Sequence, residues 1–519
     1  MLEESKSRNM VPRWRSSRKT AATNEANFGI AKHKNDYQSE LAVIEAEFSL
    51  TPTVPIASEL MFLASEAKNA ALAQRAANFI IGASSSIKFK SILKLAYNSA
   101  KSPATNELNN SSEGTDFLRE ARQLLSLEYR NPVLLVDIAR ELTSKGHHRS
   151  ALRYIRSAIA LAPESRFIVR SVARYFLHIG DHEQAHTMLR RSPNIKTDPW
   201  LQATELAIAT IRNKPSLLTK STFRSLTAAK YLGPEFTELA SAVATVEFNS
   251  GSNKIAKDLF KKALVNPNDN SLAQAEWAAE KLKLIVDERA LQTPLSFEAN
   301  SKNAYRRLEI TQAITHAKKW ALDEPFASRP HDALNYLYSL EDDFENALRS
   351  AETAIRVSGN DKISLHLNRL YAQIQLGNID ESYSELLRLS NHKDAKSHAI
   401  HLIADYGALA YATNDIVQGR LFYERAVELA RKRRDNHAES QALAFFAHSA
   451  VAHGDPKAID ILDRANKQVE KVPSHGATYV VSRLVSEEKR KVLIAAAQSR
   501  IQQRKWTWDA ASNTLNMFE

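Results

Sequence analysis

The chain has 519 residues, no cysteine, and only 13 glycines and 16 prolines. Glycine and proline lie well below their averages of roughly 7% and 5%, which argues against turn-dense β-sandwiches, β-barrels and glycine-lined nucleotide folds. Basic residues exceed acidic ones by 70 to 59, for a net charge of +11. Without cysteine the chain has no disulfide, thiolate nucleophile or Cys-ligated metal, which suits a reducing compartment, and we expect the cytoplasm.

The first 36 residues are polar and basic, and they contain no apolar run long enough for a signal-peptide core. We interpret residues 1–36 as a solvated, disordered arm, with an arm that touches nucleic acid or a membrane as the alternative. The sequence has no run of 18 apolar residues, so we expect no membrane-spanning helix. Residues 37–97 are predicted to form an N-terminal helical cap, followed by the polar stretch 98–115.

A helix pair is predicted from Pro132 onward. Two clusters of apolar or small residues have helical spacing, with Gly146 between them and Pro163 after the second. The clusters contain Leu135, Ile138, Ala139, Leu142, Ala151, Ile155 and Ala158. Because small residues let two helices approach closely, the pattern predicts an antiparallel pair.

The same pattern recurs along the chain. One period later it is filled by Val169, Val172, Ala173, Phe176, Ala185 and Leu189. It returns in units that begin at Ser328, Ile400 and Ser440, and in weaker form around 244–267 and 367–386. Residues 198–232 and 271–325 have helical periodicity without the motif, so we expect irregular or inserted helices there.

This pattern resembles the tetratricopeptide repeat (TPR), a helix pair of about 34 residues with a recognisable set of large and small positions. The resemblance implies an all-α fold: a right-handed α-solenoid of TPR-like helix pairs with helical caps. We expect one solenoid arm over 115–288 and a second over 305–472, divided by the polar stretch 289–304. Residues 473–519 would then form a C-terminal capping helix and a tail, with Trp506 and Trp508 folded back on the last helices.

No catalytic motif stands out in the sequence, which contains no phosphate-binding glycine loop and no metalloprotease or hydrolase signature. The densest histidine cluster is His178, His182 and His186, which we interpret as surface residues beside a turn rather than metal ligands. We therefore expect no enzyme activity, no cofactor and no metal.

The positive charge is concentrated between Arg130 and Lys230, where 17 basic residues face 7 acidic ones for a net of +10. In the TPR family the first helix of each pair lines a concave groove, with positions 2, 5, 9, 12 and 13 toward the ligand. The resemblance thus implies groove positions for Arg140, Arg170, Arg174 and Phe167. Guanidiniums on adjacent inner helices could clamp an acidic peptide or a C-terminal carboxylate by bidentate hydrogen bonds.

These observations predict a non-enzymatic scaffold or adaptor that binds a protein partner or acidic peptide in its groove. One alternative is a solvated basic face, with arginines such as Arg149, Arg153 and Arg156 serving solubility. Another is a nucleic-acid-binding or sensing subunit of a multi-protein complex, for example in bacterial defence or signalling. It is weakened because aromatic residues are not interleaved with the arginines as stacking platforms. The partner's identity and the oligomeric state stay open.

Overall fold

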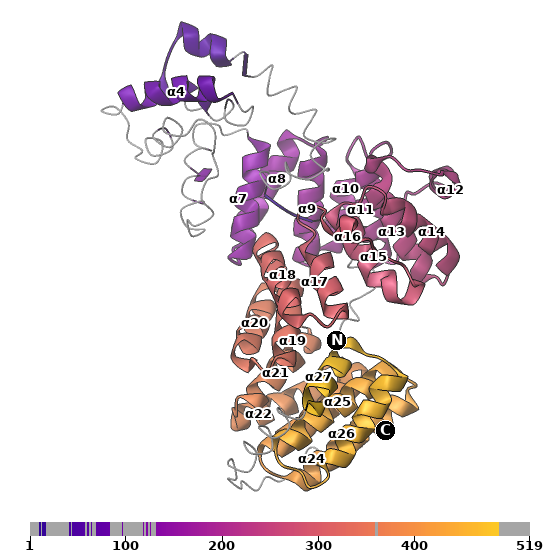
Figure 1. Ribbon diagram of the computed structural model, residues 1–519. Helices are drawn as coiled ribbons and strands as arrows, with labels where there is room; N and C mark the ends of the chain where they lie inside the picture. The colour runs from indigo at the N-terminus through magenta and orange to yellow at the C-terminus, as the bar shows by residue number, and fades with distance from the viewer. Residues whose placement is uncertain are drawn as a thin grey trace. The chain divides into compact units, whose positions relative to one another are not determined.

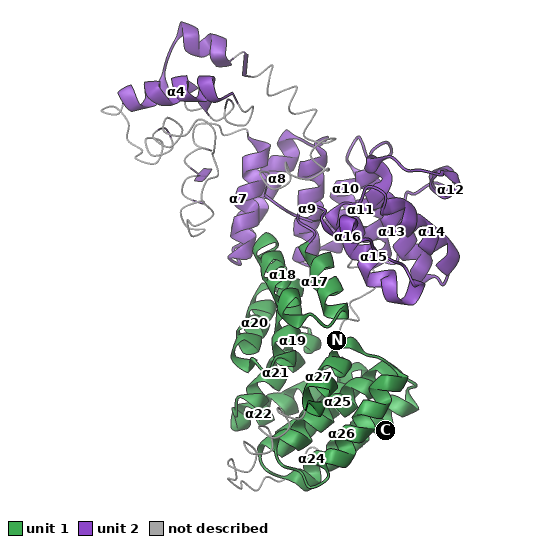
Figure 2. Ribbon diagram, in the orientation of Figure 1, with its two compact units in different colours: residues 1–2, 297–519 green, residues 3–296 purple. Residues whose placement is uncertain are grey.

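The computed structural model describes residues 131–358 and 362–486, shorter segments at 10–11, 13–16 and 69–83, and scattered positions between 41 and 125. Within these residues every regular element is helical and no strand occurs, which confirms the all-α prediction. None of the described helices is long and apolar enough to span a bilayer. The chain divides into two compact units: unit 1 comprises residues 1–2 and 297–519, and unit 2 comprises residues 3–296 (Figure 2).

Unit 2 consists of successive helices, most of them packed in sequence-adjacent pairs (Figure 1). Its elements are α4 (Ala70–Gly82), α7 (Pro132–Ser144), α8 (His148–Leu161), α9 (Arg166–His178), α10 (His182–Arg190), α11 (Pro199–Ile211), α12 (Lys220–Ala228), η3 (Pro234–Phe236), α13 (Thr237–Asn249), α14 (Asn253–Ala263), α15 (Asp269–Leu282) and α16 (Glu288–Leu291). Helices α7 and α8, α9 and α10, and α13 and α14 form pairs. Helix α12 instead packs on α14, so the predicted irregularity within 198–232 is found in the structure.

Unit 1 continues the pairing from residue 297 onward. Its elements are α17 (Phe297–Arg306), α18 (Ile310–Asp323), α19 (Ser328–Leu340), α20 (Phe344–Val357), α21 (Ile363–Gln375), α22 (Ile379–Ser390), η4 (Ala395–His398), α23 (Ala399–Ala412), α24 (Ile416–Lys432), α25 (Asn436–Ala452), α26 (Ala458–Lys471) and α27 (His475–Val485). Helices α17 and α18 form a regular pair, although 271–325 was expected to be irregular. Small buried residues, Ala304, Ala313 and Ala317, let them enter the unit's core despite the missing motif.

The turns between paired helices depend on one residue in the left-handed backbone region. Gly146 and Gly180 take this conformation, with φ of +77° and +80°. In unit 1, Asp342 and Asn414 take the corresponding places with φ of +59° and +62°. Asparagine and aspartate tolerate this region better than other non-glycine residues, so the array can form with few glycines.

Helices α23 and α24 approach closely through two reciprocal contacts between glycine and tyrosine. A Cβ atom added to Gly407 would lie 2.6 Å from the ring of Tyr423, and one added to Gly419 would lie 2.6 Å from the ring of Tyr411. Each helix therefore presents a glycine to the tyrosine of its partner. The small positions of the repeat motif are explained here by direct steric need.

Helix α27 ties the end of unit 1 to its beginning. It packs on α25 and α26 and also contacts α17 and α19. The backbone N–H of Gly476 donates to Tyr305 Oη at 2.9 Å, and Arg483 Nη2 donates to Asp342 at 2.5 Å. Of the predicted C-terminal cap and tail, residues 473–519, the structure describes only residues 473–486, so Trp506 and Trp508 lie outside the described residues.

Candidate functional site

The inner helices of unit 2 carry the arginines that the repeat register assigns to the groove. Arg170 on α9 is only 2% exposed, and its Nη2 donates to Glu238 Oε1 on α13 at 2.6 Å. Its guanidinium lies 5.2 Å from the ring centroid of Trp200, a cation–π distance. The other contacts of Glu238 come from Asn268 and Asn270, whose amide nitrogens donate at 3.1 and 3.2 Å. Arg170 is therefore one member of a buried ion pair.

A segment near the N-terminus lies against the same inner helices. Trp14 is fully buried and packs edge-on against Tyr175 of α9, with ring centroids 6.1 Å apart. The backbone carbonyl of Trp14 accepts a hydrogen bond from Arg140 Nε at 3.0 Å. Met10 belongs to the apolar cluster that α11, α13 and α15 form. Arg140 thus contacts peptide backbone, and the peptide belongs to this chain.

Two further arginines of the segment converge on one carboxylate. Arg15 Nη2 lies 2.7 Å and Arg13 Nε 3.3 Å from Oδ2 of Asp269, the first residue of α15. Burial acts to raise the pKa of Asp269, but the guanidiniums of Arg15, Arg13 and Arg170 outweigh it and leave the pKa lowered. The first residue of α15 therefore receives two cations from the segment.

The structure corrects one sequence prediction at this site and leaves another untested. Residues 13–16 do not form a solvated arm, because Trp14 buries a large ring and the flanking arginines pair with a buried carboxylate; the remainder of 1–36 lies outside the described residues except for 10 and 11. The acidic-peptide clamp stays a prediction, and at Arg170 an incoming carboxylate would have to compete with Glu238, which already pairs with the guanidinium. Arg174 and Phe167 are half-buried on α9.

The histidine cluster also differs from its interpretation as surface residues. His186 is buried, with Nε2 2.9 Å from Glu205 Oε1. Arg190 donates to the same Glu205 oxygen at 2.9 Å. Burial acts to raise the pKa of Glu205, but hydrogen bonds from His186, Ser216, Leu217 and Arg190 leave it lowered. In the part of the chain that the structure describes, no three His, Asp or Glu side chains could hold a metal ion together.

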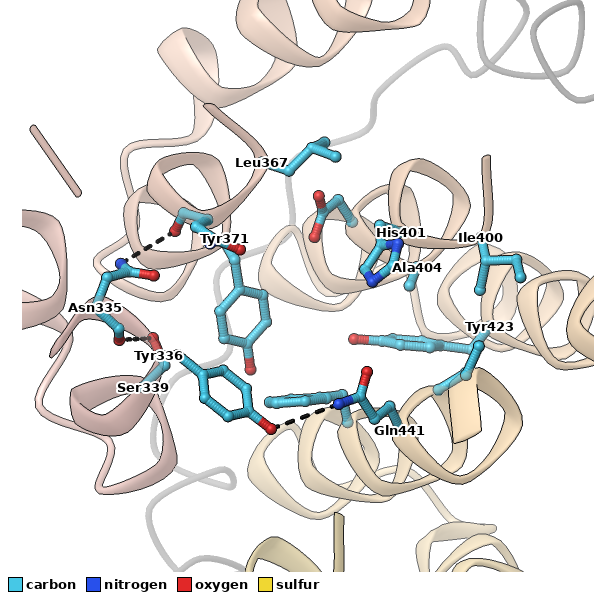
Figure 3. Close-up of a pocket in the computed structure, with 15 residues that line it drawn as sticks. Asn335, Tyr336, Ser339, Leu367, Tyr371, Ile400, His401, Ala404, Tyr423 and Gln441 are labelled. Carbon is cyan, nitrogen blue, oxygen red and sulfur yellow. Dashed lines mark hydrogen bonds between the residues drawn. The ribbon is translucent and has the colours of Figure 1, made fainter. Parts of the chain in front are cut away.

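Unit 1 contains a pocket that sequence reasoning missed. It has a cavity volume of about 80 Å³ and is lined from α19, α21, α23, α24 and α25 (Figure 3). Tyr336, Tyr371, Tyr423 and Phe445 supply aromatic walls. The packing holds these rings in place, since Tyr371 and Phe445 meet edge-on with centroids 5.4 Å apart.

Hydrogen bonds fix several of the polar lining groups. Gln441 Nε2 donates to Tyr336 Oη at 3.5 Å, and Asn335 Nδ2 donates to the carbonyl of Asn368 at 3.4 Å (Figure 3). Tyr423 Oη lies 3.0 Å from the hydroxyl of Ser449. These contacts connect α19, α21, α24 and α25 around the pocket.

Among the titratable groups that line the pocket, Asp405 is buried, whereas His401 and Tyr371 are half-buried, and none of the lining residues that the structure describes is a lysine or arginine. The Asp405 side chain has no hydrogen-bond partner among the described residues, and burial raises its pKa well above the usual value. Burial lowers the pKa of His401 to about 3, so the imidazole is neutral near pH 7. The buried hydroxyl of Tyr371 also lacks a hydrogen-bond partner within the described part of the chain.

A signal for this pocket is present in the sequence. Groove positions 9 and 12 of the unit that begins at Ser328 are Tyr336 and Ser339, and position 2 of the next two units is His401 and Gln441. All four line the pocket. The same groove positions of the repeat that predict Arg140, Arg170 and Arg174 also predict these four residues. They carry no net positive charge, so the charge excess of residues 130–230 does not point to them.

No protein-family profile and no curated protein matches the chain. One similar solved structure is the APC/C hetero-tetramer Cut9-Hcn1, with 14% sequence identity over 90% of this chain and 94% of that chain and a TM-score of 0.34. Another is yeast Tom70, with 13% identity over 77% of this chain and 91% of that chain and a TM-score of 0.29. A third is Naa15/Naa10 bound to HypK-THB, with 13% identity over 94% of this chain and 85% of that chain and a TM-score of 0.25. The packing of the chain itself has the repeat pattern. The small positions of its packed helix pairs are fully buried alanines: Ala139, Ala151, Ala158, Ala173 and Ala185. The fold is a TPR-like helical repeat.

Proposed function

We propose that the chain is a non-enzymatic protein-interaction scaffold whose unit 2 groove binds a short extended peptide segment. The observation that carries this proposal is the chain's own segment 13–16 on the inner helices, with Trp14 fully buried. A surface that buries an indole and pairs with a peptide carbonyl has the features of a peptide site, because such sites combine a deep aromatic anchor with backbone hydrogen bonds.

The charge of the groove favours a basic and aromatic partner segment. Asp269 accepts from both Arg13 and Arg15, whereas Arg170 is paired with Glu238. A partner that offers an aromatic residue between two basic ones would satisfy the same groups. Residues 13–16 then compete with the partner from within the chain. Arg140 donates to the bound backbone, and Arg174 and Phe167 are proposed to contact its continuation.

Fluorescence anisotropy with a labelled synthetic peptide of the sequence Met10–Ser16 tests the proposal. A tethered segment has an effective concentration in the millimolar range, so the unchanged chain should bind the free peptide weakly. The full chain with Trp14→Ala should bind it at least tenfold more tightly, because its own segment no longer holds the groove.

Two controls complete this test. A peptide with the tryptophan replaced by alanine should not bind, and Arg149→Ala, at an exposed arginine on α8, should change nothing. Equal affinity of the unchanged chain and the Trp14→Ala chain for the peptide would contradict the proposal, provided that circular dichroism shows both folded.

The nucleic-acid alternative receives less support. Several arginines of the +10 segment are neutralised within the fold, including Arg166 by Asp198 and Arg190 by Glu205. Arg149, Arg153 and Arg156 are among the exposed basic residues of this segment, and all three lie on α8. Binding of single-stranded RNA that weakens steeply with salt, and that is lost when these three are replaced by glutamine, would favour this alternative.

A further inference from the structure

The pocket of unit 1 combines two features that rarely occur together without a ligand. Asp405 is a carboxyl group that is 7% exposed, and no described residue donates a hydrogen bond to it. Tyr336, Tyr371 and Tyr423 surround the same space with aromatic rings (Figure 3). A buried carboxylate without a partner costs free energy, so a fold that keeps one calls for an explanation.

The lining has no cation of its own. None of the lining residues is lysine or arginine. The one basic side chain, His401, is held neutral because burial lowers its pKa to about 3. The lining therefore supplies no counter-charge for Asp405 when its carboxyl is ionised.

We propose that this pocket binds an alkylammonium group, such as a lysine side chain of a partner, between the Asp405 carboxylate and the tyrosine rings. A cation over the face of a tyrosine ring is attracted by the ring quadrupole, and the attraction is stronger where water is excluded. The ammonium group also gives the buried Tyr371 hydroxyl a donor, since a hydroxyl oxygen has two acceptor lone pairs. An alkyl stem packs against Phe445 and Leu367 of the lining.

Anions and neutral ligands fit the pocket less well. An anion would meet the carboxyl of Asp405 with no cation nearby to offset it. A neutral alcohol would satisfy one hydrogen bond but would leave the ionised carboxylate uncompensated. The site lies entirely within unit 1, so it is independent of the groove in unit 2.

Binding should depend on pH through one group. The titratable groups that face Asp405 are His401 on its own helix, Tyr336 from α19, Tyr371 from α21 and Tyr423 from α24, and α25 contributes none to the lining. Burial raises the pKa of the three tyrosines above their usual 10 and lowers that of His401 to about 3. Asp405 is therefore the pocket group whose ionisation should control the affinity for a cation, and that affinity should rise as pH rises through its raised pKa.

Calorimetry on the full chain with three probes tests the proposal. The probes are Nα-acetyl-lysine-N-methylamide, 1,4-diaminobutane and the neutral Nα-acetyl-norleucine-N-methylamide, at matched ionic strength. The lysine compound or the diamine should bind one per chain, and the norleucine compound at least tenfold more weakly. Tighter binding of the lysine compound indicates a peptide source, and tighter binding of the diamine indicates a free amine.

Two variants connect the binding to the pocket. Asp405→Asn should weaken the cation at least tenfold and remove the pH dependence, while Asp460→Asn, at an exposed carboxyl on α26, should leave both unchanged. Circular dichroism verifies that both variants fold. Equal affinity for the lysine and norleucine compounds, or cation binding unchanged by Asp405→Asn, would overturn the proposal.

Discussion

The guanidinium of Arg15 lies 2.7 Å from the carboxylate of Asp269, across 254 residues of sequence, and both side chains are buried. This contact joins the beginning of the described chain to the first turn of α15. The N-terminus of a helix favours a negative charge, and Arg15 brings a positive one there. Asp269 lies between them, because its carboxylate is favoured by the helix N-terminus and also pairs with Arg15. The pair therefore holds the segment against the first turn of α15.

Asp269→Asn should destabilise unit 2 by about 3–5 kcal/mol, because it leaves Arg13 and Arg15 buried beside a neutral amide. Urea denaturation measures the loss. Asp258→Asn is the matched control: Asp258 is exposed, and its partner Lys262 keeps a hydrogen bond to the carbonyl of Thr227, so stability should change by no more than about 0.5 kcal/mol. If both variants lose equally little, the buried pair does not hold the segment.

The same pair predicts a pH dependence. The pKa of Asp269 is lowered in the fold, so its contribution is present above the usual value of 3.8 and is lost as pH falls through the lowered pKa. The stability gap between the unchanged chain and Asp269→Asn should therefore narrow below pH 3.8. A gap of constant size down to pH 2 would argue that the carboxylate is not the group that matters.

Gly419→Ala should destabilise unit 1 by about 1–3 kcal/mol, because the new methyl group would meet the ring of Tyr411 at 2.6 Å. Helix propensity alone predicts the opposite sign, since alanine is the better helix former. Gly82→Ala is the matched control: nothing lies within 4 Å of its Cβ position at the end of α4. Thermal unfolding of both variants distinguishes the steric effect at Gly419 from the effect of helix propensity. A higher melting temperature for Gly419→Ala would contradict the close approach of Gly419 to the ring of Tyr411.

The helix pairs could be predicted because their determinants are local and periodic. Ala139, Ala151 and Ala158 are small where two helices meet, and this need recurs with every unit. Such a pattern is visible in one sequence without knowledge of what packs against what. The fold class follows directly from it.

The candidate sites depend on individual long-range contacts, which do not repeat along the sequence as the helix-pair positions do. Trp14 meets Tyr175 from a seven-residue stretch too short to show a pattern, and the sequence offers only a tryptophan between arginines as a clue. Asn335, which replaces the usual small residue, marks the pocket only as an exception to the motif. The charge excess of residues 130–230 does not show which arginines are available to a ligand, because Arg170 pairs with Glu238, 68 residues away.

Asp342→Asn should loosen α27 from the rest of unit 1. Asp342 accepts from Arg483 on α27 at 2.5 Å, and Nε2 of His448 on α25 lies 3.0 Å from it. Asparagine keeps the left-handed turn at φ +59°, so the change removes charge rather than backbone geometry. Because the carboxylate is partly exposed, we expect a loss of about 1–2 kcal/mol. Hydrogen exchange should accelerate in α27 and stay unchanged in α7, whereas equal acceleration in both would indicate global destabilisation.

Asp405→Asn should stabilise the chain in the absence of ligand, by about 1–3 kcal/mol near pH 8, because it removes a buried carboxylate that no described residue compensates. The pKa of Asp405 is raised in the fold, so its favourable contribution is complete below the usual 3.8 and is lost as pH rises through the raised pKa. The two proteins should therefore have similar stability at pH 4 and diverge as pH rises, until the difference levels off above the raised pKa.

Thermal unfolding between pH 4 and 9 measures this divergence, with Asp460→Asn as the control that should not diverge. A destabilised Asp405→Asn at pH 8 would mean that the fold itself uses the carboxylate, and that its burial is not a cost retained for a ligand.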